Sequence, residues 1–385
     1  MPALEISGST ALALLPILII ALLPILRRLQ TQLSTLRSPK QSHEIVALRI
    51  YPIKSCRGIT LPRTKLLEQG LALDRRWMIV DAETHSFLTI RQNPRMTLIT
   101  TALTSTNPND SNSNADPQEL NLQITLPPPE TENDTNTNTS PKPTTLIIPA
   151  HPTATYLSTH TTLAHDIKIW DTTTDGHIYN EEINAAISAF MGRPVALVYK
   201  GPTPRILKGN GDPRLLGREQ STNFPDVHPV QIASEASLAE LNTRLVAQGE
   251  KAITIERFRP NIIVKGVVPW EEDRWKTVRI VASGGSEGSD GKGKGKPGKN
   301  GKDLVLDIVA RCARCHVPNV EPATAEEHRK QPWDTLMAYR RVDEGMKYKP
   351  CFGMLSAPRA EGEIAVGMRL EVLQETTAHR YIAGF

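Results

Sequence analysis

The chain reads Ala310-Arg-Cys-Ala-Arg-Cys-His-Val-Pro-Asn-Val-Glu-Pro322 directly after a β-branched run, Leu304-Val-Leu-Asp-Ile-Val309. Two cysteines stand here in a Cys-x-x-Cys spacing, which occurs in zinc sites and in thioredoxin-like redox proteins. A structural zinc site needs a second pair of ligands, and the other two cysteines lie far away and apart from each other. A thioredoxin-like fold would continue into a helix, which Pro318 and Pro322 interrupt. The stretch therefore favours a β-rich protein and argues against both of those sites.

One of these two thiols remains available as a metal ligand. His316 is adjacent to Cys315, which is a poor spacing for chelation of one ion by both side chains. Arg311 and Arg314 accompany the cysteines, and nearby positive charge favours the thiolate, which is the form that binds metals. We therefore expect a single thiolate that binds a soft metal.

Short apolar segments bounded by Gly, Pro or charged residues recur along the chain, as strands do. They are residues 44–51, 76–81, 96–100, 277–281 and 304–309. We expect an α+β, β-rich fold. Its expected parts are a membrane anchor and stalk in residues 1–43, a β-rich domain in residues 44–200 and a second domain in residues 201–385.

Two helices are expected to pack on these strands. Asn180 opens the first, which has apolar residues at helical spacing and which Gly192 ends. Ser234 opens the second, in which Ser237 and Glu240 have the spacing of a capping box.

Two tracts of low complexity interrupt this pattern. Residues 104–145 consist mainly of Asn, Thr, Ser, Pro and Asp, broken by one apolar stretch at residues 120–126 that we interpret as a single strand. Residues 283–302 are rich in Gly, Lys and Ser, and we interpret them as the long connection of a β-hairpin. Contact of these lysines with an anionic membrane surface is the alternative interpretation.

The N-terminal region holds a long apolar run. Residues 6–26 carry no charge, and this run is long enough for a helix to cross a bilayer. A cleavable secretory signal would have a basic region first, and here Glu5 precedes the run while Arg27 and Arg28 follow it. We expect an uncleaved anchor with a cytosol-facing body, because Lys and Arg next to a membrane helix stay on the cytosolic side.

Composition argues against two classes of protein. Four cysteines in 385 residues are too few for a disulfide scaffold, which agrees with a reducing compartment. A formal net charge of +4 is small for this length, and no basic helix marks a nucleic-acid groove, so we expect no nucleic acid as a partner.

Two segments have residues that suit an oxyanion. In Tyr51-Pro-Ile-Lys-Ser-Cys-Arg-Gly58, a cation and a hydroxyl in a tight turn suit a phosphate, although an exposed turn lysine would give the same pattern. In Leu73-Asp-Arg-Arg-Trp77, one of two arginines before an apolar strand is positioned for a ligand or forms a surface pair with the aspartate.

Two further segments combine a buried element with polar groups. In Arg257-Phe-Arg-Pro-Asn-Ile-Ile-Val264, Arg259 offers a planar fork for phosphate and Asn261 can bind the edge of a heterocycle. Ser234 stands at a helix start, where free N–H groups bind anions, and an ordinary N-cap is the alternative.

Together these segments resemble the MOSC family, and within it the amidoxime-reducing component subfamily. The resemblance runs from about residue 44 to the C-terminus. It rests on six ordered motifs: Tyr-Pro-x-Lys-Ser-Cys at Tyr51, Asp74-Arg75, Arg-Gln-x-Pro-Arg at Arg91, Ser-Glu-Ala-Ser-Leu at Ser234, Arg-Phe-Arg-Pro-Asn at Arg257, and Arg314-Cys315. It implies two β-barrel-like domains, the MOSC N-terminal domain followed by the MOSC domain with packing helices.

The resemblance also implies a molybdenum cofactor, Mo-molybdopterin, to which the protein adds one cysteine thiolate. Cys315 would be that metal ligand and the catalytic residue. The cofactor-binding residues would be Lys54, Ser55, Arg75, His228, Ser234, Arg259, Asn261 and Arg314. His228 enters because Val227-His228 replace a Thr-Ser pair of the family, and residues 316–319 also depart from the family pattern.

The function implied by the resemblance is the reduction of N-hydroxylated compounds, amidoximes and hydroxylamines among them. Electrons would come from NADH through NADH-cytochrome b5 reductase and cytochrome b5, at the mitochondrial outer membrane. The alternative is a sulfur carrier or a molybdenum cofactor sulfuration protein, because MOSC domains also occur in sulfurases. A non-catalytic membrane-surface protein is the third hypothesis.

Overall fold

The computed structural model describes residues 41–105, 120–128, 142–282 and 303–384. The apolar run at residues 6–26 lies outside this part of the chain, as do the Gly/Lys-rich tract and most of the Asn/Thr-rich one. Within the described ranges no helix is long and apolar enough to span a membrane. The predicted anchor therefore stays a prediction.

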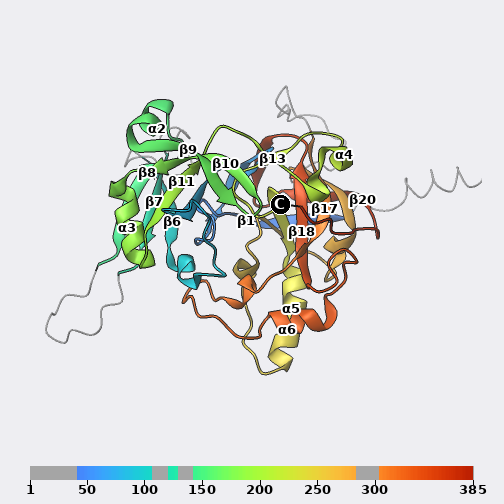
Figure 1. Cartoon of the computed structure of the whole chain (residues 1–385). Coiled ribbons are helices and arrows are strands. Elements are labelled where there is room, and N and C mark those ends of the chain that lie inside the picture. Colours follow the sequence, from blue (N-terminus) through green and yellow to red (C-terminus); the bar gives the residue numbers. More distant parts are fainter. Residues whose placement is uncertain (1–40, 106–119, 129–141, 283–302, 385) are drawn as a thin grey trace, which may run out of the picture. The chain divides into compact units, whose positions relative to one another are not determined.

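A closed barrel of seven strands is the largest sheet of the described body, and its strands β17, β18 and β20 are labelled on the right in Figure 1. The strands follow one another around it in the order β15 (Ile262–Val264), β14 (Val230–Ser234), β18 (Cys351–Pro358), β17 (Leu304–Ala313), β16 (Trp275–Val281), β20 (Arg369–Glu375) and β1 (Ser42–Ile50). Pairing of β1 with β15 closes the ring, and β2 (Ile59–Leu61) adds to the edge of β1. Only β14 and β15 pair in parallel among these strands.

Alternating apolar residues of these strands fill the barrel. In β1 the buried apolar side chains are Ile45, Leu48 and Ile50, and their partners in the core include Ile232 and Ile262. Side chains of a strand alternate between its two faces, and the irregularity of β1 between Ile45 and Ala47 shifts this alternation by one residue, so that Ile45, Leu48 and Ile50 all face the core.

Four smaller sheets accompany the barrel in the described residues. A four-stranded antiparallel sheet has the order β5 (Trp77–Asp81), β11 (Val195–Lys200), β10 (Thr172–Tyr179) and β9 (Thr161–Ile169). Two three-stranded sheets consist of β6 (Thr100–Ser105), β7 (Leu120–Leu126) and β8 (Thr144–Pro149), and of β19 (Gly362–Ala365), β3 (Arg63–Leu67) and β4 (Gly70–Leu71). A short pair joins β12 (Arg205–Ile206) to β13 (Ser221–Thr222).

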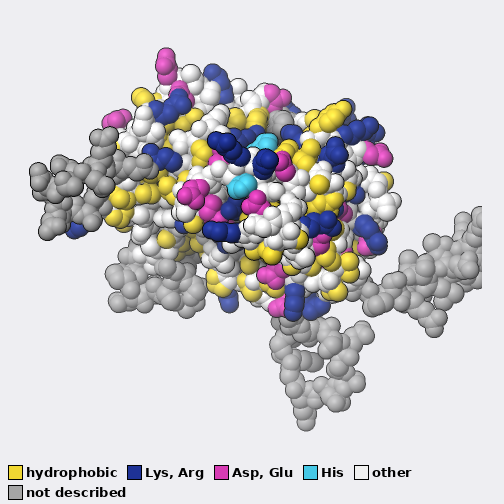
Figure 2. All heavy atoms as spheres, turned by 90° about the horizontal axis from the view of Figure 1, so that it is seen from below, with side chains coloured by type: hydrophobic (Ala, Val, Ile, Leu, Met, Phe, Trp, Pro, Cys, Tyr) yellow, Lys and Arg dark blue, Asp and Glu magenta, His cyan; other side chains and the backbone are white. Residues whose placement is uncertain are grey.

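The described helices are few and short. They are α2 (Ala154–His160), α3 (Glu181–Met191), α4 (Pro213–Leu216), α5 (Glu235–Ala247) and α6 (Trp333–Tyr339), with the 3₁₀ turns η1 (Pro94–Leu98), η3 (Gly209–Gly211), η4 (Ile255–Phe258), η5 (Glu271–Arg274) and η6 (Val317–Asn319). The face seen from below, which α5 and α6 approach, mixes acidic and basic side chains with hydrophobic ones (Figure 2).

Several local predictions are confirmed. The expected strand at residues 120–126 is β7, and β16 and β17 pair as the expected hairpin. Asn180 and Gly192 are the cap residues that flank α3, and Gly192 adopts the left-handed conformation that favours glycine at a helix end. Ser234 directly precedes α5. The division of the body at residues 200 and 201 stays a prediction.

Two local predictions are wrong. Residues 96–100 were expected as a strand, but Pro94–Leu98 form a 3₁₀ helix, because the fixed φ of Pro94 suits a helical first turn, and β6 begins only at Thr100. Ser237 and Glu240 make no capping box, since the Ser237 hydroxyl donates to the buried Glu272 from inside α5.

Candidate functional site

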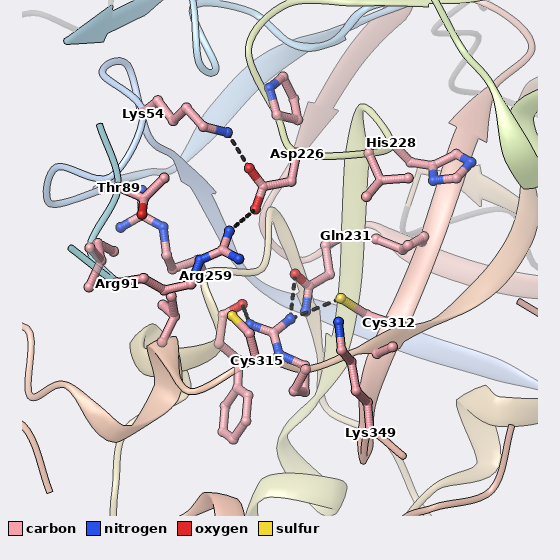
Figure 3. A pocket seen from close by; sticks show the side chains of 18 of the residues that line it. Lys54, Thr89, Arg91, Asp226, His228, Gln231, Arg259, Cys312, Cys315 and Lys349 are labelled. Carbon is pink, nitrogen blue, oxygen red and sulfur yellow. Dashed lines mark hydrogen bonds and ion pairs between the residues drawn. The ribbon is translucent and has the colours of Figure 1, made fainter. Parts of the chain in front are cut away.

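A cavity of about 300 Å³ opens where the end of β17 meets loops from both halves of the chain. Figure 3 shows Lys54 and Asp226 on one side of it, Cys312 and Cys315 on the other, and Gln231 between them. The lining residues are Lys54, Ser55, Arg75, Thr89, Ile90, Arg91, Trp170, Pro225, Asp226, Val227, His228, Gln231, Phe258, Arg259, Asn261, Cys312, Ala313, Arg314, Cys315, Val317, Met346, Lys349, Leu355, Tyr381 and Ala383.

The structure brings nearly all of the predicted site residues to this one cavity. Those that line it are Lys54, Ser55, Arg75, His228, Arg259, Asn261, Arg314 and Cys315. Ser234 does not line it. The Ser234 side chain is fully buried, and it lies against Gly266, where a Cβ would overlap the Ser234 hydroxyl oxygen.

The cavity is strongly cationic. Its ionisable lining has one carboxylate, Asp226, against six basic side chains, which are Lys54, Arg75, Arg91, Arg259, Arg314 and Lys349. Lys54 and Arg91 both form ion pairs with Asp226. An excess of guanidinium and ammonium groups in a partly enclosed space favours an anionic ligand.

Tyr51 holds two of these arginines together. The guanidinium carbons of Arg75 and Arg259 lie 4.5 Å and 4.1 Å from the centroid of the fully buried Tyr51 ring. Arg75 also donates to the Asp74 carboxylate at 2.6 Å, whereas Arg259 Nη1 donates to the Cys56 carbonyl at 2.7 Å. Burial, with the charge of Arg75 as a smaller cause, lowers the pKa of Arg259 to about 10.

The backbone of the site adopts left-handed conformations at residues other than glycine. Ser55, Arg75, Trp170 and Arg259 have φ angles of 72°, 47°, 54° and 56°. Such conformations cost of order 1–3 kcal/mol each and gather at ligand-binding sites, where the surrounding structure imposes them. All four residues line the cavity.

Lys54 is fixed by two oxygen atoms. Its ammonium group donates to the Phe224 carbonyl at 2.8 Å and to the Asp226 carboxylate. Burial lowers the pKa of Lys54 to about 8, and Asp226 opposes this shift. Burial by itself would raise the pKa of Asp226, but Lys54 and Arg91 outweigh it and hold that pKa below its usual range.

Asn261 has a structural role that the sequence did not reveal. Its Oδ1 accepts from the Gln231 backbone N–H at 3.1 Å and from Arg75 at 3.3 Å, and its Nδ2 donates to the Arg49 carbonyl at 3.2 Å. These bonds join β14, β15 and the end of β1. The amide edge expected to bind a heterocycle is therefore already largely used within the protein.

The two cysteines differ in their surroundings. Arg314 donates to Cys312 Sγ at 2.9 Å, and its other donors bind Gln231 Oε1 at 3.2 Å and the Phe258 carbonyl at 3.0 Å. Burial raises the pKa of the Cys312 thiol. Cys315 lines the same cavity and is partly exposed.

Arg311 does not contribute to the thiol environment as expected. Its guanidinium group donates to the His379 carbonyl at 3.0 Å and to Asp343 at 3.5 Å, and it does not line the cavity. Arg314 thus contacts the thiol of Cys312, whereas Arg311 contacts the C-terminal region and Asp343.

His228 is buried at the cavity wall, with 4% of its surface exposed. Neither ring nitrogen has a hydrogen-bond partner among the described residues. Burial lowers the pKa of His228 to about 3, so the imidazole is neutral.

Other buried polar atoms of the lining also lack protein partners. They are Arg259 Nη2, Gln231 Nε2 and Arg314 Nε, none of which bonds to another described residue. Buried donors are nearly always satisfied in folded proteins, so a group of them around one cavity indicates a ligand with several acceptors. A pterin with a phosphate offers such acceptors, and Cys315 offers the sulfur that a soft metal takes.

Sequence reasoning missed several lining residues. Gln231 lies in the segment that singles out Ser234, but the sequence gives it no role of its own. Tyr51 lies in the lysine motif and does not line the cavity; it packs behind it, under Arg75 and Arg259. Lys349, Met346 and Tyr381 carried no local signal, because only the folding of the C-terminal region brings them to the cavity.

Comparison with known proteins agrees with the sequence resemblance. The model of the MOSC N-terminal beta barrel domain matches residues 42–194, and that of the MOSC domain matches residues 219–371. "Mitochondrial amidoxime reducing component 2" of Rattus norvegicus is 27% identical over 344 residues, which cover 86% of this chain and 83% of the relative.

Two further relatives match over a similar length. "Mitochondrial amidoxime-reducing component 1" of Homo sapiens is 27% identical over 337 residues, covering 85% of this chain and 82% of the relative. The protein of the same name from Danio rerio is 24% identical over 329 residues, covering 84% and 82%. The chain therefore belongs to the MOSC family, with a MOSC N-terminal domain followed by a MOSC domain, and it is a homologue of proteins named mitochondrial amidoxime-reducing components.

Proposed function

We propose that the protein is a molybdenum cofactor-dependent reductase of N-hydroxylated compounds, such as amidoximes and hydroxylamines. The names of its homologues support this reaction class. The observation that carries the proposal is the cavity in which Cys315 lies together with six basic side chains and a single carboxylate. That combination suits an anionic cofactor with a thiolate-bound metal.

Cys315 would supply sulfur to the metal, while Arg75, Arg259 and Lys54 would bind the phosphate. The two arginines are pre-positioned on the Tyr51 ring, so little side-chain entropy is lost when an anion binds. When bound, the cofactor supplies a metal centre for two-electron reduction. The chain itself orients the cofactor and limits the access of water.

The neutral His228 and the Nε2 group of Gln231, which has no partner among the described residues, are polar groups of the wall that offer hydrogen bonds at neutral pH without adding charge. They suit the hydroxyl and nitrogen atoms of a small, uncharged substrate.

Electron donors and location follow from the same proposal. Cytochrome b5 and NADH-cytochrome b5 reductase would pass electrons from NADH to the site. The apolar run at residues 6–26 would anchor the protein in the mitochondrial outer membrane, with its body facing the cytosol.

Elemental and pterin analysis of the purified full-length chain tests the proposal. We expect about one molybdenum and one pterin per wild-type chain, and reduction of benzamidoxime with NADH, cytochrome b5 and its reductase. Cys315→Ser should lose the metal and the activity. Cys312→Ser is the matched control, because it changes a thiol of the same cavity and should retain the metal.

Undiminished molybdenum in Cys315→Ser would overturn the ligand assignment. Wild-type chain that holds no molybdenum and carries a persulfide on Cys315 would support the sulfur-carrier alternative instead.

A further inference from the structure

The last described segment of the chain, residues 376–384, forms part of the cavity wall. We call it the C-terminal strap. Tyr381 and Ala383 line the cavity, and the buried Tyr381 ring packs in one apolar cluster with Ala310 of β17 and Leu355 of β18. Figure 1 marks this end of the chain beside the same two strands.

Alternate residues of the strap face inward. His379 and Tyr381 are both 7% exposed, whereas Arg380 and Ile382 are exposed. This alternation is typical of an extended segment with one buried face. The strap is therefore packed on the body.

On its inner side the strap is held by two buried charged residues. Asp343 Oδ1 accepts from the Tyr381 backbone N–H at 2.8 Å, and Arg311 donates to the His379 carbonyl at 3.0 Å. The ring of His379 lies 2.7 Å from the Trp275 carbonyl oxygen. These contacts fix the part of the strap that precedes the cavity.

On its outer side a single amide clips the strap. Asn210 Nδ2 donates to the Arg380 carbonyl at 2.9 Å, and Asn210 Oδ1 accepts from the Ile382 backbone N–H at 2.7 Å. Asn210 does not line the cavity. The clip therefore holds the backbone on both sides of Tyr381 without touching a ligand.

Two glycines allow the close approach of the strap. A Cβ on Gly345 would overlap the carbonyl oxygen of Tyr381, and a Cβ on Gly209 would overlap that of Ile382. Gly209 also has a φ of 57°, which other residues rarely adopt. The body is thus shaped to receive this segment.

Tyr381 is the strap's main contribution to the wall. Its hydroxyl makes no hydrogen bond to another described residue, and burial raises its pKa to about 12, with the nearby Cys312 and Asp226 as smaller causes. The side chain thus lines the cavity near Cys312, which packs against the same apolar cluster. The MOSC domain match ends at residue 371, so the strap lies beyond the part of the chain that the family model describes.

We propose that the C-terminal strap is a size filter that closes one side of the cavity and limits which molecules reach Cys312 and Cys315. For the substrates, this inference rests on the proposed function: the strap selects small N-hydroxylated compounds over bulky ones. Access of any reagent to the thiols does not depend on that function.

Thiol labelling of the full-length chain measures access directly. N-ethylmaleimide and the bulkier fluorescein maleimide are applied separately, and modification of Cys312 is followed by mass spectrometry. Cys56 and Cys351 are fully buried and serve as internal references. We measure the ratio of the bulky to the small labelling rate.

Asn210→Ala removes both bonds of the clip and should raise this ratio by about tenfold, the effect of losing roughly 1.4 kcal/mol of local stability. Asn210→Asp keeps the acceptor for Ile382 and should give a smaller increase. Arg380→Ala is the control, since it changes an exposed side chain of the strap and leaves the backbone acceptor in place; its ratio should equal that of wild type.

The same variants are then compared by kcat/KM for a bulky and a small amidoxime. In Asn210→Ala we expect kcat/KM to rise for the bulky amidoxime relative to the small one, with unchanged molybdenum content. An unchanged labelling ratio overturns the size filter, whatever the activity of the chain. A raised labelling ratio in a chain without reductase activity supports the size filter and contradicts only the proposed reductase function.

Discussion

Arg75 and Arg259 lie over the same ring, that of Tyr51, and Arg75 Nη2 donates to the Arg259 carbonyl at 3.2 Å. Two guanidinium groups held this close repel each other, and Asp74 pairs with only one of them. Arg259 Nη2 is buried and has no partner among the described residues. The two guanidinium groups therefore carry more positive charge than Asp74 balances, and Arg259 Nη2 offers a donor, so the pair favours binding of an anion.

Arg259→Gln tests this relationship through anion binding. We expect the dissociation constant for inorganic pyrophosphate, measured by calorimetry on chain free of cofactor, to rise about tenfold, because one charged hydrogen-bond donor is lost. Arg76→Gln is the matched control, since Arg76 also lies over a tyrosine ring, that of Tyr199, but outside the cavity. Equal effects of the two substitutions would contradict the assignment.

Asn261→Ala should act on stability rather than on ligand binding alone. It leaves the buried Gln231 N–H and Arg49 carbonyl without a partner, so the free energy of unfolding in urea should fall by about 3 kcal/mol. Asn242→Ala also loses two bonds, both to Ile253, but at a partly buried site, and should cost about 1 kcal/mol. Wild-type stability in Asn261→Ala would show that the residue serves the ligand instead.

His228 should make the protein sensitive to mild acid. Its pKa is about 3 when folded and 6.5 in the reference state, so between these values the unfolded chain binds the extra proton and stability falls as the pH falls. From pH 7.5 to 5.5 the free energy of unfolding in urea should fall by about 1.4 kcal/mol more for the wild type than for His228→Asn. Parallel pH profiles of the two proteins would refute a buried, neutral histidine.

Glu272 should act in the opposite direction. Burial raises its pKa to about 7 from 4.5, so the folded chain binds the extra proton between these values and stability falls as the pH rises. In Glu272→Gln this loss disappears. Between pH 5 and 7.5 the free energy of unfolding of the wild type should therefore fall by about 2 kcal/mol more than that of the variant. Glu344→Gln, at an exposed position, should follow the wild type at both pH values.

Much of the candidate site could be predicted because its chemistry is written in short segments. Lys54 with Ser55 and Arg314 with Cys315 follow an apolar stretch, and Arg259 with Asn261 precede one, so that each pair stands where a turn presents side chains at the edge of a sheet. Order along the chain and residue type sufficed to select them. The strand at residues 120–126 and the ends of α3 were predictable for the same reason, since periodicity and helix-end residues are local signals.

What each side chain contacts could not be predicted in this way. The amide of Asn261 bonds to neighbouring strands, Arg311 donates to Asp343, and Ser234 does not line the cavity. These contacts depend on which strands close the barrel, and no local segment reveals that. A one-residue difference in direction along a strand moves a side chain to the opposite face.

The sequence by itself determined the β-rich character, the family and the residues that could carry an anionic, thiol-bound cofactor. Only the tertiary structure decided that six cations share one cavity, that Tyr51 holds two of them and that residues 376–384 form a wall beside Cys312. The reason is physical: residue type fixes the charge and donors that a side chain offers, whereas long-range strand pairing and packing fix the atoms that it meets.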